Sequence, residues 1–148
     1  MIFVDTNIFY NILYETELTP KARRVVDLLV EPVTSVTVYN ELLHVILRAY
    51  ARRRYGIVSY YEFRRFFAGK GMDAFKEPME SIHRLLEELG VEILEDYQSI
   101  EELRNVITGY RLLPTDAQIA VTCKHYGIKT IATLDEDFKR IPWLKIIP

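Results

Sequence analysis

The sequence predicts an α/β protein with three layers, in which helices cover both faces of a short, mostly parallel central sheet. Two observations lead to this fold class. The candidate strands are short, and residues 2–4 are apolar throughout, which is typical of a strand buried on both faces. The strands alternate with segments whose apolar residues recur every three or four positions, and strands joined through helices pair in parallel.

The length and composition of the chain predict a single folded domain over residues 1–148. Hydrophobic residues make up 49% and charged residues 27%, which is ordinary for a globular protein. No run approaches the roughly 18 apolar residues of a membrane span, so we expect no membrane partner. Cys123 is the only cysteine, which excludes an internal disulfide and favours a reducing compartment, the cytoplasm.

The first third of the chain predicts two strands, each followed by a helix. Residues 2–4 run directly into a short helix, and Thr19 and Pro20 predict the next helix as its N-cap and first residue. The predicted buried side of that second helix consists of Val25, Val26, Leu28 and Leu29. A strand near 33–35 then leads into a long helix, with Glu41 in its first turns.

Residues 37–89 form a run of predicted helices between two strands, with a helical insertion at about 48–89. Ser59 and Glu62 have the spacing of a capping box, and Gly90 marks the end of the last helix. Residues 48–76 carry eight basic and two acidic side chains, a net +6 that leaves −8 for the rest of a chain whose formal charge is −2. Such a basic lobe can hold a polyanion, although solvated helix faces explain it equally well. The candidate RNA-binding residues are Arg48, Arg52, Arg53, Arg64 and Arg65.

Large aromatic side chains lie among these basic residues. Packing in the core or at a subunit interface is favoured over stacking on unpaired bases, because large aromatics dominate both kinds of packing. We therefore expect a homodimer. The aromatic residues concerned are Tyr50, Tyr55, Tyr60, Tyr61, Phe63, Phe66, Phe67 and Phe75.

The last third continues the alternation. Residues 91–94 predict a strand, and a capping box from Ser99 to Glu102 opens the helix after it. Thr115 is the predicted N-cap of the next helix, with Gln118 completing its box. A buried strand at 129–134 and an edge strand at 144–147 follow.

Four acids are placed by this topology at one edge of the sheet. The carboxyl ends of parallel strands share a rim, where open α/β sheets bind ligands. Asp5 and Asp135 follow strands there, and Glu41 and Asp116 open helices that start from it. Singly, Asp5 is also explained as an N-cap and Asp116 as an acid at a helix N-terminus. Together the acids would repel one another without a cation, and Mg²⁺ or Mn²⁺ prefers such carboxylate ligands.

Short motifs at 4–7, 40–43, 115–120 and 133–138 carry a family resemblance over nearly the whole chain. In this order the sequence resembles the PIN domain, the metal-dependent ribonuclease fold common among the toxins of VapBC toxin–antitoxin pairs. The resemblance implies catalytic acids at Asp5, Glu41, Asp116 and Asp135, of which Asp5, Asp116 and Asp135 bind the metal. It implies supporting roles for Thr6, Asn7, Thr133 and Asp137. Asp135 is favoured over Asp137 as the ligand because it lies nearer the strand end.

The predicted function is a metal-dependent endoribonuclease, a VapC-like toxin with RNA as substrate and an antitoxin protein as partner. The alternatives are a catalytically silent PIN-like module that binds RNA or protein, and a structure-specific DNA nuclease. Asn7 stands where a haloacid-dehalogenase phosphatase needs a second acid, and no phosphate-binding loop is present. His44, His83 and His125 lack metal-ligand spacing and are interpreted as surface or packing residues.

Overall fold

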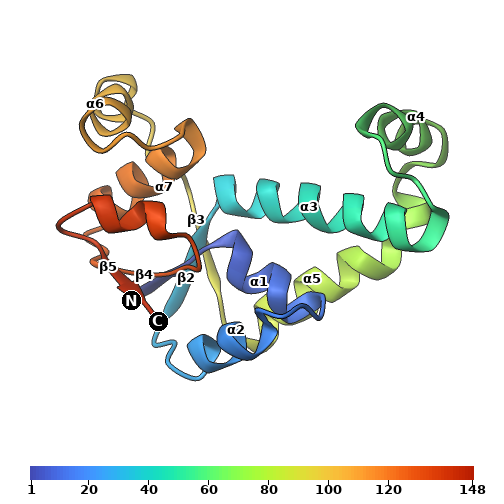
Figure 1. Ribbon diagram of the computed structural model, residues 1–148, viewed down its shortest axis with the longest axis horizontal. Coiled ribbons are helices and arrows are strands. Elements are labelled where there is room, and N and C mark those ends of the chain that lie inside the picture. The colour runs from blue at the N-terminus through green and yellow to red at the C-terminus, as the bar shows by residue number, and fades with distance from the viewer.

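Five parallel strands form a sheet with helices on both faces (Figure 1). The computed structural model describes all residues, 1–148, and its strand order is β3-β2-β1-β4-β5, with every neighbouring pair parallel. The predicted three-layer α/β/α fold is confirmed. The strands are β1 (Ile2–Val4), β2 (Pro32–Ser35), β3 (Glu92–Leu94), β4 (Thr130–Ala132) and β5 (Lys145–Ile147).

Helices fill every connection between consecutive strands, as the alternating pattern predicts. Two of them leave the sheet almost at once, because only Asp5 separates β1 from α1 and because α3 begins at the residue after β2. None of the helices combines the length and the apolar character needed to cross a bilayer. The helices are α1 (Thr6–Leu13), α2 (Thr19–Val26), α3 (Val36–Tyr55), α4 (Tyr60–Lys70), α5 (Lys76–Glu88), α6 (Ile100–Tyr110) and α7 (Pro114–His125), with 3-10 helices η1 (Gly71–Phe75) and η2 (Glu136–Arg140).

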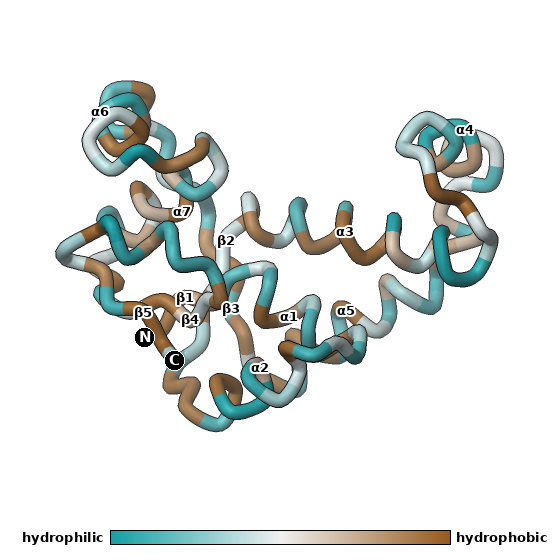
Figure 2. The backbone as a smooth tube through the Cα atoms, in the orientation of Figure 1, coloured by the Kyte–Doolittle hydropathy of each residue, from teal (hydrophilic) through white to brown (hydrophobic).

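The main core lies around the two central strands. Phe3 and Val4 of β1 and Ile131 and Ala132 of β4 are fully buried, which explains why these strands are apolar. Cys123 of α7 is also fully buried and packs as a small apolar residue, and burial raises the pKa of its thiol. Hydrophobic residues gather at the sheet, whereas hydrophilic and hydrophobic residues alternate along α3 and α5 (Figure 2).

The pairing register of the central strands brings two distant parts of the chain together at the rim. Val4 lies opposite Ala132, and the backbone N–H of Asp5 donates to the carbonyl of Ala132 at 3.0 Å. The residues that follow each strand, Asp5 and Thr133, are therefore neighbours although 128 positions separate them in the sequence.

A helical arm, residues 47–75, extends away from the sheet. It comprises the distal part of α3, α4 and η1, and α4 lies at the far end of the molecule from the sheet (Figure 1). The arm has a small core of its own, made of Leu47, Ala51, Phe63 and Phe75. The packing role predicted for the aromatic residues is confirmed for Phe63 and Phe75, which are buried there. Helix α5 then returns to the main core, where its Ile82 is fully buried.

Two predicted helix N-caps are wrong. Thr19 is the first residue of α2, where Leu18 holds the N-cap position. Its hydroxyl instead donates to the carbonyl of Asn11 at 2.7 Å and so fixes the turn between α1 and α2. Helix α7 starts at Pro114, with the extended Leu113 before it, because proline suits the first helical position. Thr115 is therefore not a cap, and Gln118 donates to the carbonyl of Tyr97 at 2.8 Å rather than closing a box.

The predicted burial of Leu28 is also wrong. Helix α2 ends at Val26, two residues before Leu28, so Leu28 no longer follows the buried face of the helix. Its side chain is 56% exposed.

The separate core of the helical arm predicts a localised response to Phe75→Ala. Removing this fully buried ring should cost about 3–5 kcal/mol where the arm packs. Hydrogen exchange of the α4 amides should accelerate far more than that of β1 and β4. Phe138→Ala, a fully buried ring of the main core, is the control that should loosen the sheet itself. If Phe75→Ala accelerated hydrogen exchange equally in α4 and in the sheet, the arm would not have a core that is separate from the main core.

Candidate active site

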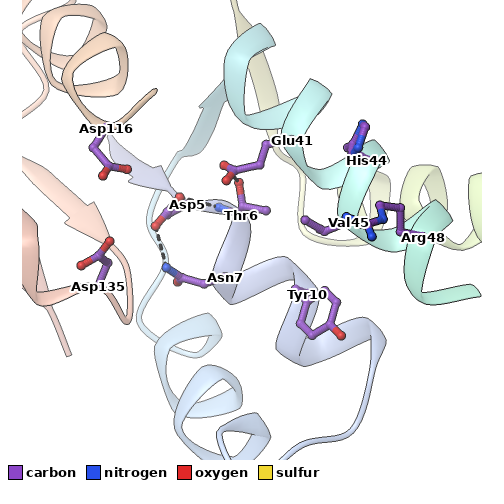
Figure 3. A pocket seen from close by; sticks show the side chains of 10 residues that line it. All are labelled: Asp5, Thr6, Asn7, Tyr10, Glu41, His44, Val45, Arg48, Asp116 and Asp135. Carbon is purple, nitrogen blue, oxygen red and sulfur yellow. Dashed lines mark hydrogen bonds between the residues drawn. The ribbon is translucent and has the colours of Figure 1, made fainter. Parts of the chain in front are cut away.

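One pocket of about 480 Å³ at the carboxyl rim of the sheet is lined by all four predicted acids (Figure 3). Asp5 comes from the end of β1, Glu41 from α3, Asp116 from the first turn of α7, and Asp135 from the segment after β4. The other lining residues are Thr6, Asn7, Tyr10, His44, Val45 and Arg48. The fold therefore brings acids from four separate segments to one pocket. Helix capping by any one of these acids does not explain why all four lie there.

Asp5 is the most deeply buried of these acids, with 6% of its surface exposed. It does cap α1, since its Oδ1 accepts from the backbone N–H of Thr6 at 2.7 Å. Its Oδ2 accepts from Asn7 Nδ2 at 2.7 Å and from the Thr133 hydroxyl at 2.6 Å. Burial raises the pKa of Asp5 from 3.8 to about 6. The hydrogen bonds from Thr133 and Thr6 oppose this rise, and the charges of Glu41 and Asp116 add to it.

Three predicted supporting residues form a polar network around Asp5. The Thr6 hydroxyl donates to Glu41 Oε2 at 2.6 Å and links α1 to α3. Asn7 donates to Asp5 and accepts from the backbone N–H of Leu134 at 2.9 Å. The Thr133 hydroxyl also accepts from the backbone N–H of Asp135 at 3.0 Å. The network fixes the relative positions of the segments that carry Asp5, Glu41 and Asp135.

Asp116, Asp135 and Asp137 form the tightest acidic cluster. Each offers a carboxylate oxygen, and these three atoms all lie within 4.8 Å of one another. Burial raises the pKa of Asp116 to about 6, and the negative charges of Asp135, Glu41 and Asp137 add to this rise. Asp5 and Glu41 line the same pocket but are not members of this close group.

Asp135 and Asp137 differ in their surroundings. Asp135 lines the pocket, caps η2, and accepts from the backbone N–H of Asp137 at 2.8 Å. Asp137 is paired with the guanidinium of Arg140, which also donates to the carbonyl of Arg111 at 2.7 Å. The preference for Asp135 as the ligand stays a prediction that these surroundings favour.

The sequence interpretation missed three residues near the acids. Tyr10 and His44 line the pocket, and Arg140 opposes the rise in the pKa of Asp116. A signal existed for the first two, because Tyr10 follows Asn7 and His44 follows Glu41 by three residues, which places them on the same helix faces. For Arg140 no local pattern exists, since its role depends on η2 lying against the start of α7.

The other two histidines have packing roles, as predicted. The His83 ring is hydrogen-bonded to the Tyr39 hydroxyl at 2.7 Å. The His125 ring stacks on Tyr97 with a centroid distance of 3.9 Å. Neither histidine lines the pocket.

The carboxylates of the pocket suit a hard divalent cation. None of Asp5, Glu41, Asp116 and Asp135 forms a salt bridge, so no lysine or arginine neutralises them directly. Burial, and to a smaller extent the neighbouring carboxylates, raise the pKa values of Asp5 and Asp116 and so disfavour their charged forms when no cation is bound. Oxygen ligands of this kind are those that Mg²⁺ and Mn²⁺ prefer.

Comparison with known proteins identifies the family. The family model of the PIN domain matches residues 2–144 of this sequence. The chain belongs to the PIN domain family. Ribonuclease VapC2 of Methanocaldococcus jannaschii is 32% identical over 148 residues, which cover 99% of this chain and 92% of that protein. Ribonuclease VapC6 of the same organism is 34% identical over 74 residues, which cover 49% of this chain and 48% of that protein.

Solved structures share this PIN fold. A toxin–antitoxin complex from Klebsiella pneumoniae contains a chain with a TM-score of 0.60 and 17% identity, covering 100% of this chain and 97% of that one. FitAcB from Neisseria gonorrhoeae gives a TM-score of 0.60 and 15% identity, with the same coverage of 100% and 97%. The resemblance noted in the sequence is thereby confirmed at the level of family and fold.

The raised pKa of Asp5 predicts how the stability of the metal-free PIN domain depends on pH. Folded Asp5 keeps its proton up to about pH 6, whereas the unfolded chain releases it near 3.8, so the folded state binds more protons between these values. The free energy of unfolding should therefore fall as pH rises through this window, by about 3 kcal/mol for Asp5. Asp116 acts in the same direction, but its partial exposure weakens its effect.

Urea unfolding at pH 4.5 and 6.5 with a chelator present measures this dependence. The free energy of unfolding of Asp5→Asn should depend clearly less on pH than that of the wild-type protein. Asp73→Asn changes an exposed acid of the helical arm and should leave the dependence unchanged. Identical pH dependence of the free energy of unfolding in the wild-type protein and Asp5→Asn would contradict a raised pKa of Asp5.

Proposed function

We propose that this PIN domain is a VapC-like endoribonuclease toxin that hydrolyses RNA phosphodiester bonds within the strand. The observation that carries the proposal is the convergence of Asp5, Glu41, Asp116 and Asp135 on one pocket. It is supported by the similarity over almost the whole chain to a protein named a ribonuclease. We propose that residues 1–148 act as one domain, with the insertion at about 48–89 attached to it, in the cytoplasm, where the buried thiol of Cys123 stays reduced.

We assign the cation, Mg²⁺ or Mn²⁺, to Asp5, Asp116 and Asp135, with Glu41 binding it directly or through water. When bound, the cation supplies Lewis acidity that offsets charge on a phosphodiester and lowers the pKa of water. Thr6, Asn7 and Thr133 orient the carboxylates through the hydrogen bonds described above. Asp137, held by Arg140, adds negative charge at the edge of the site.

The chain's own residues can also move a proton. One oxygen of Glu41 accepts from the Thr6 hydroxyl, and its other oxygen has no hydrogen-bond partner within the protein. Glu41 can therefore accept the proton of an attacking water while Thr6 holds its side chain in place. No serine, cysteine or histidine nucleophile is required for this hydrolysis. The arginines of the basic lobe, Arg48, Arg52, Arg53, Arg64 and Arg65, are the proposed contacts to RNA phosphates.

RNA cleavage with and without divalent cations tests the proposed activity. The wild-type protein should cleave single-stranded RNA with Mg²⁺ or Mn²⁺ and stop when a chelator is added. Asp5→Asn should keep the fold and lose at least a hundredfold in rate, because a ligand is removed. Asp73→Asn, the same change at an exposed acid far from the pocket, should retain full activity.

The same assay separates the alternatives. RNA that is bound but stays intact with either cation would favour a silent binding module. Preferential cleavage of flap DNA over single-stranded RNA would favour a structure-specific DNA nuclease. Full metal-dependent activity in Asp5→Asn would refute the assigned site.

We propose an antitoxin protein as the partner. The solved structures that share the fold include toxin–antitoxin complexes, and the pocket's acids offer a place for a cationic side chain of a partner. Expression of the chain alone should arrest growth, and Asp5→Asn should relieve the arrest. Normal growth of cells that accumulate active wild-type protein would contradict a toxin role.

A homodimer is proposed on the basis of the exposed apolar residues of the helical arm. Tyr60 and Tyr61 are 46% and 68% exposed. Analytical ultracentrifugation should show a mass near twice the 17.4 kDa of the chain. Tyr61→Ser should shift the protein toward monomer at low concentration. A wild-type protein that sediments at monomer mass at micromolar concentration would rule out the dimer.

A further inference from the structure

A second groove, of about 610 Å³, adjoins the acidic pocket along α3. Tyr10 and Arg48 line both cavities, so the groove continues the pocket rather than forming a separate site. Arg52 and Arg53 add positive charge to its lining, and Ile57 and Val58 add apolar surface. A ligand held at the acids can therefore extend into this groove without leaving the surface.

The arginines of the groove carry positive charge that the protein itself does not neutralise. Arg48, Arg52 and Arg53 are exposed, and none of them forms a salt bridge with a carboxylate. Aromatic rings hold two of the side chains in place. The Arg53 guanidinium lies 4.2 Å from the Tyr14 ring centroid, and that of Arg48 lies 5.2 Å from the Tyr60 centroid. Such pre-positioned guanidinium groups are suited to phosphate.

Helical spacing aligns the arginines with the acids. Arg48 and Arg52 follow Glu41 by seven and eleven residues, so all three lie on one side of α3, with the arginines roughly 10 and 16 Å along the axis. Figure 3 shows Arg48 beyond Glu41 and His44 on the same helix, with Tyr10 of α1 across from it. The step from Arg48 to Arg52 is comparable to the distance between successive phosphates in an extended strand.

The groove also offers apolar surface to bases. The ring of Tyr10 lies at the junction of the two cavities, and the side chain of Val58 is 62% exposed. Stacking on such a ring requires a base that is not paired in a duplex. Charge and shape together favour a single-stranded polynucleotide.

We propose that this arginine groove binds the single-stranded RNA that flanks the scissile phosphate on one side. Arg48, Arg52 and Arg53 contact successive phosphates, and Tyr10 stacks on a base at the entrance. The inference rests on the proposed ribonuclease activity and gives the substrate a direction: the nucleotides on one side of the cleaved bond are held by α3, and those on the other side are not.

Salt-dependent binding tests the groove without requiring cleavage. Affinity for a fluorescent eight-nucleotide single-stranded RNA is measured by anisotropy with a chelator present. Arg52→Ala with Arg53→Ala should make the slope of log affinity against log salt less steep by about 1.4, because each lost phosphate contact contributes about 0.7. Arg23→Ala with Arg24→Ala removes the same charge from an exposed pair on α2 and should leave the slope unchanged.

Cleavage of RNAs extended on either side of one bond tests the direction. Extension on one side only should lower KM, and the Arg52/Arg53 double variant should lose that gain, on the order of tenfold, with kcat little changed. The proposal would be overturned if the Arg23/Arg24 control variant lost the KM gain to the same extent. It would also be overturned if both extensions lowered KM and the Arg52/Arg53 variant kept this effect. Unchanged RNA binding together with weaker capture of a co-expressed antitoxin would assign the groove to a protein instead.

The two proposals fail in different ways. If the wild-type protein cleaves no RNA, the proposed function fails while the anisotropy measurement still reports on the groove. If the wild-type protein cleaves RNA but the Arg52/Arg53 variant matches it in slope and KM, only the groove is wrong.

Discussion

The burial of carboxylates close to one another at the rim of the parallel sheet is the constraint on which the rest of the site depends. The β1–β4 register brings Asp5 against the segment that carries Asp135, and the direct exits into α1 and α3 bring Glu41 to the same side. Hydrogen bonds from Thr6, Asn7 and Thr133 hold these groups in place although their charges oppose one another. The protein thus holds several carboxylates close together, and a divalent cation can neutralise their charge.

Helix α3 connects this acidic centre to a basic surface. Glu41 lies near its N-terminal end, the unpaired Arg48 and Arg52 lie further along, and the helical arm with its own small core extends from the distal part. The arm therefore does more than lengthen the domain, because it supports the groove wall at Arg53 and Val58. Helix α3 therefore sets the spacing between the acidic pocket and the arginine groove.

Local patterns were sufficient to predict most of the architecture. The apolar strands and the N-caps at Ser59 and Ser99 are confirmed, since each depends on residues close in sequence, although the Glu62 and Glu102 side chains do not complete the capping boxes. The predicted caps at Thr19 and Thr115 failed because a tertiary partner, Asn11, and a proline at the first helical position decided those helix starts. The gathering of the acids followed from parallel topology. Helical spacing from Asn7 and Glu41 could have indicated Tyr10 and His44. The position of Arg140 near Asp116 required knowledge of which elements face one another across the pocket, which no local pattern contains.

The most direct measurement of the central claim is an NMR titration of the carboxyl groups of Asp5 and Asp116 with and without Mg²⁺. Without the cation, the pKa of each should lie near 6, as burial and neighbouring charges dictate. Saturating Mg²⁺ should lower the pKa of both carboxyl groups together, because the cation stabilises their charged forms. Values that Mg²⁺ leaves unchanged would contradict the account of a carboxylate pocket built around a divalent cation.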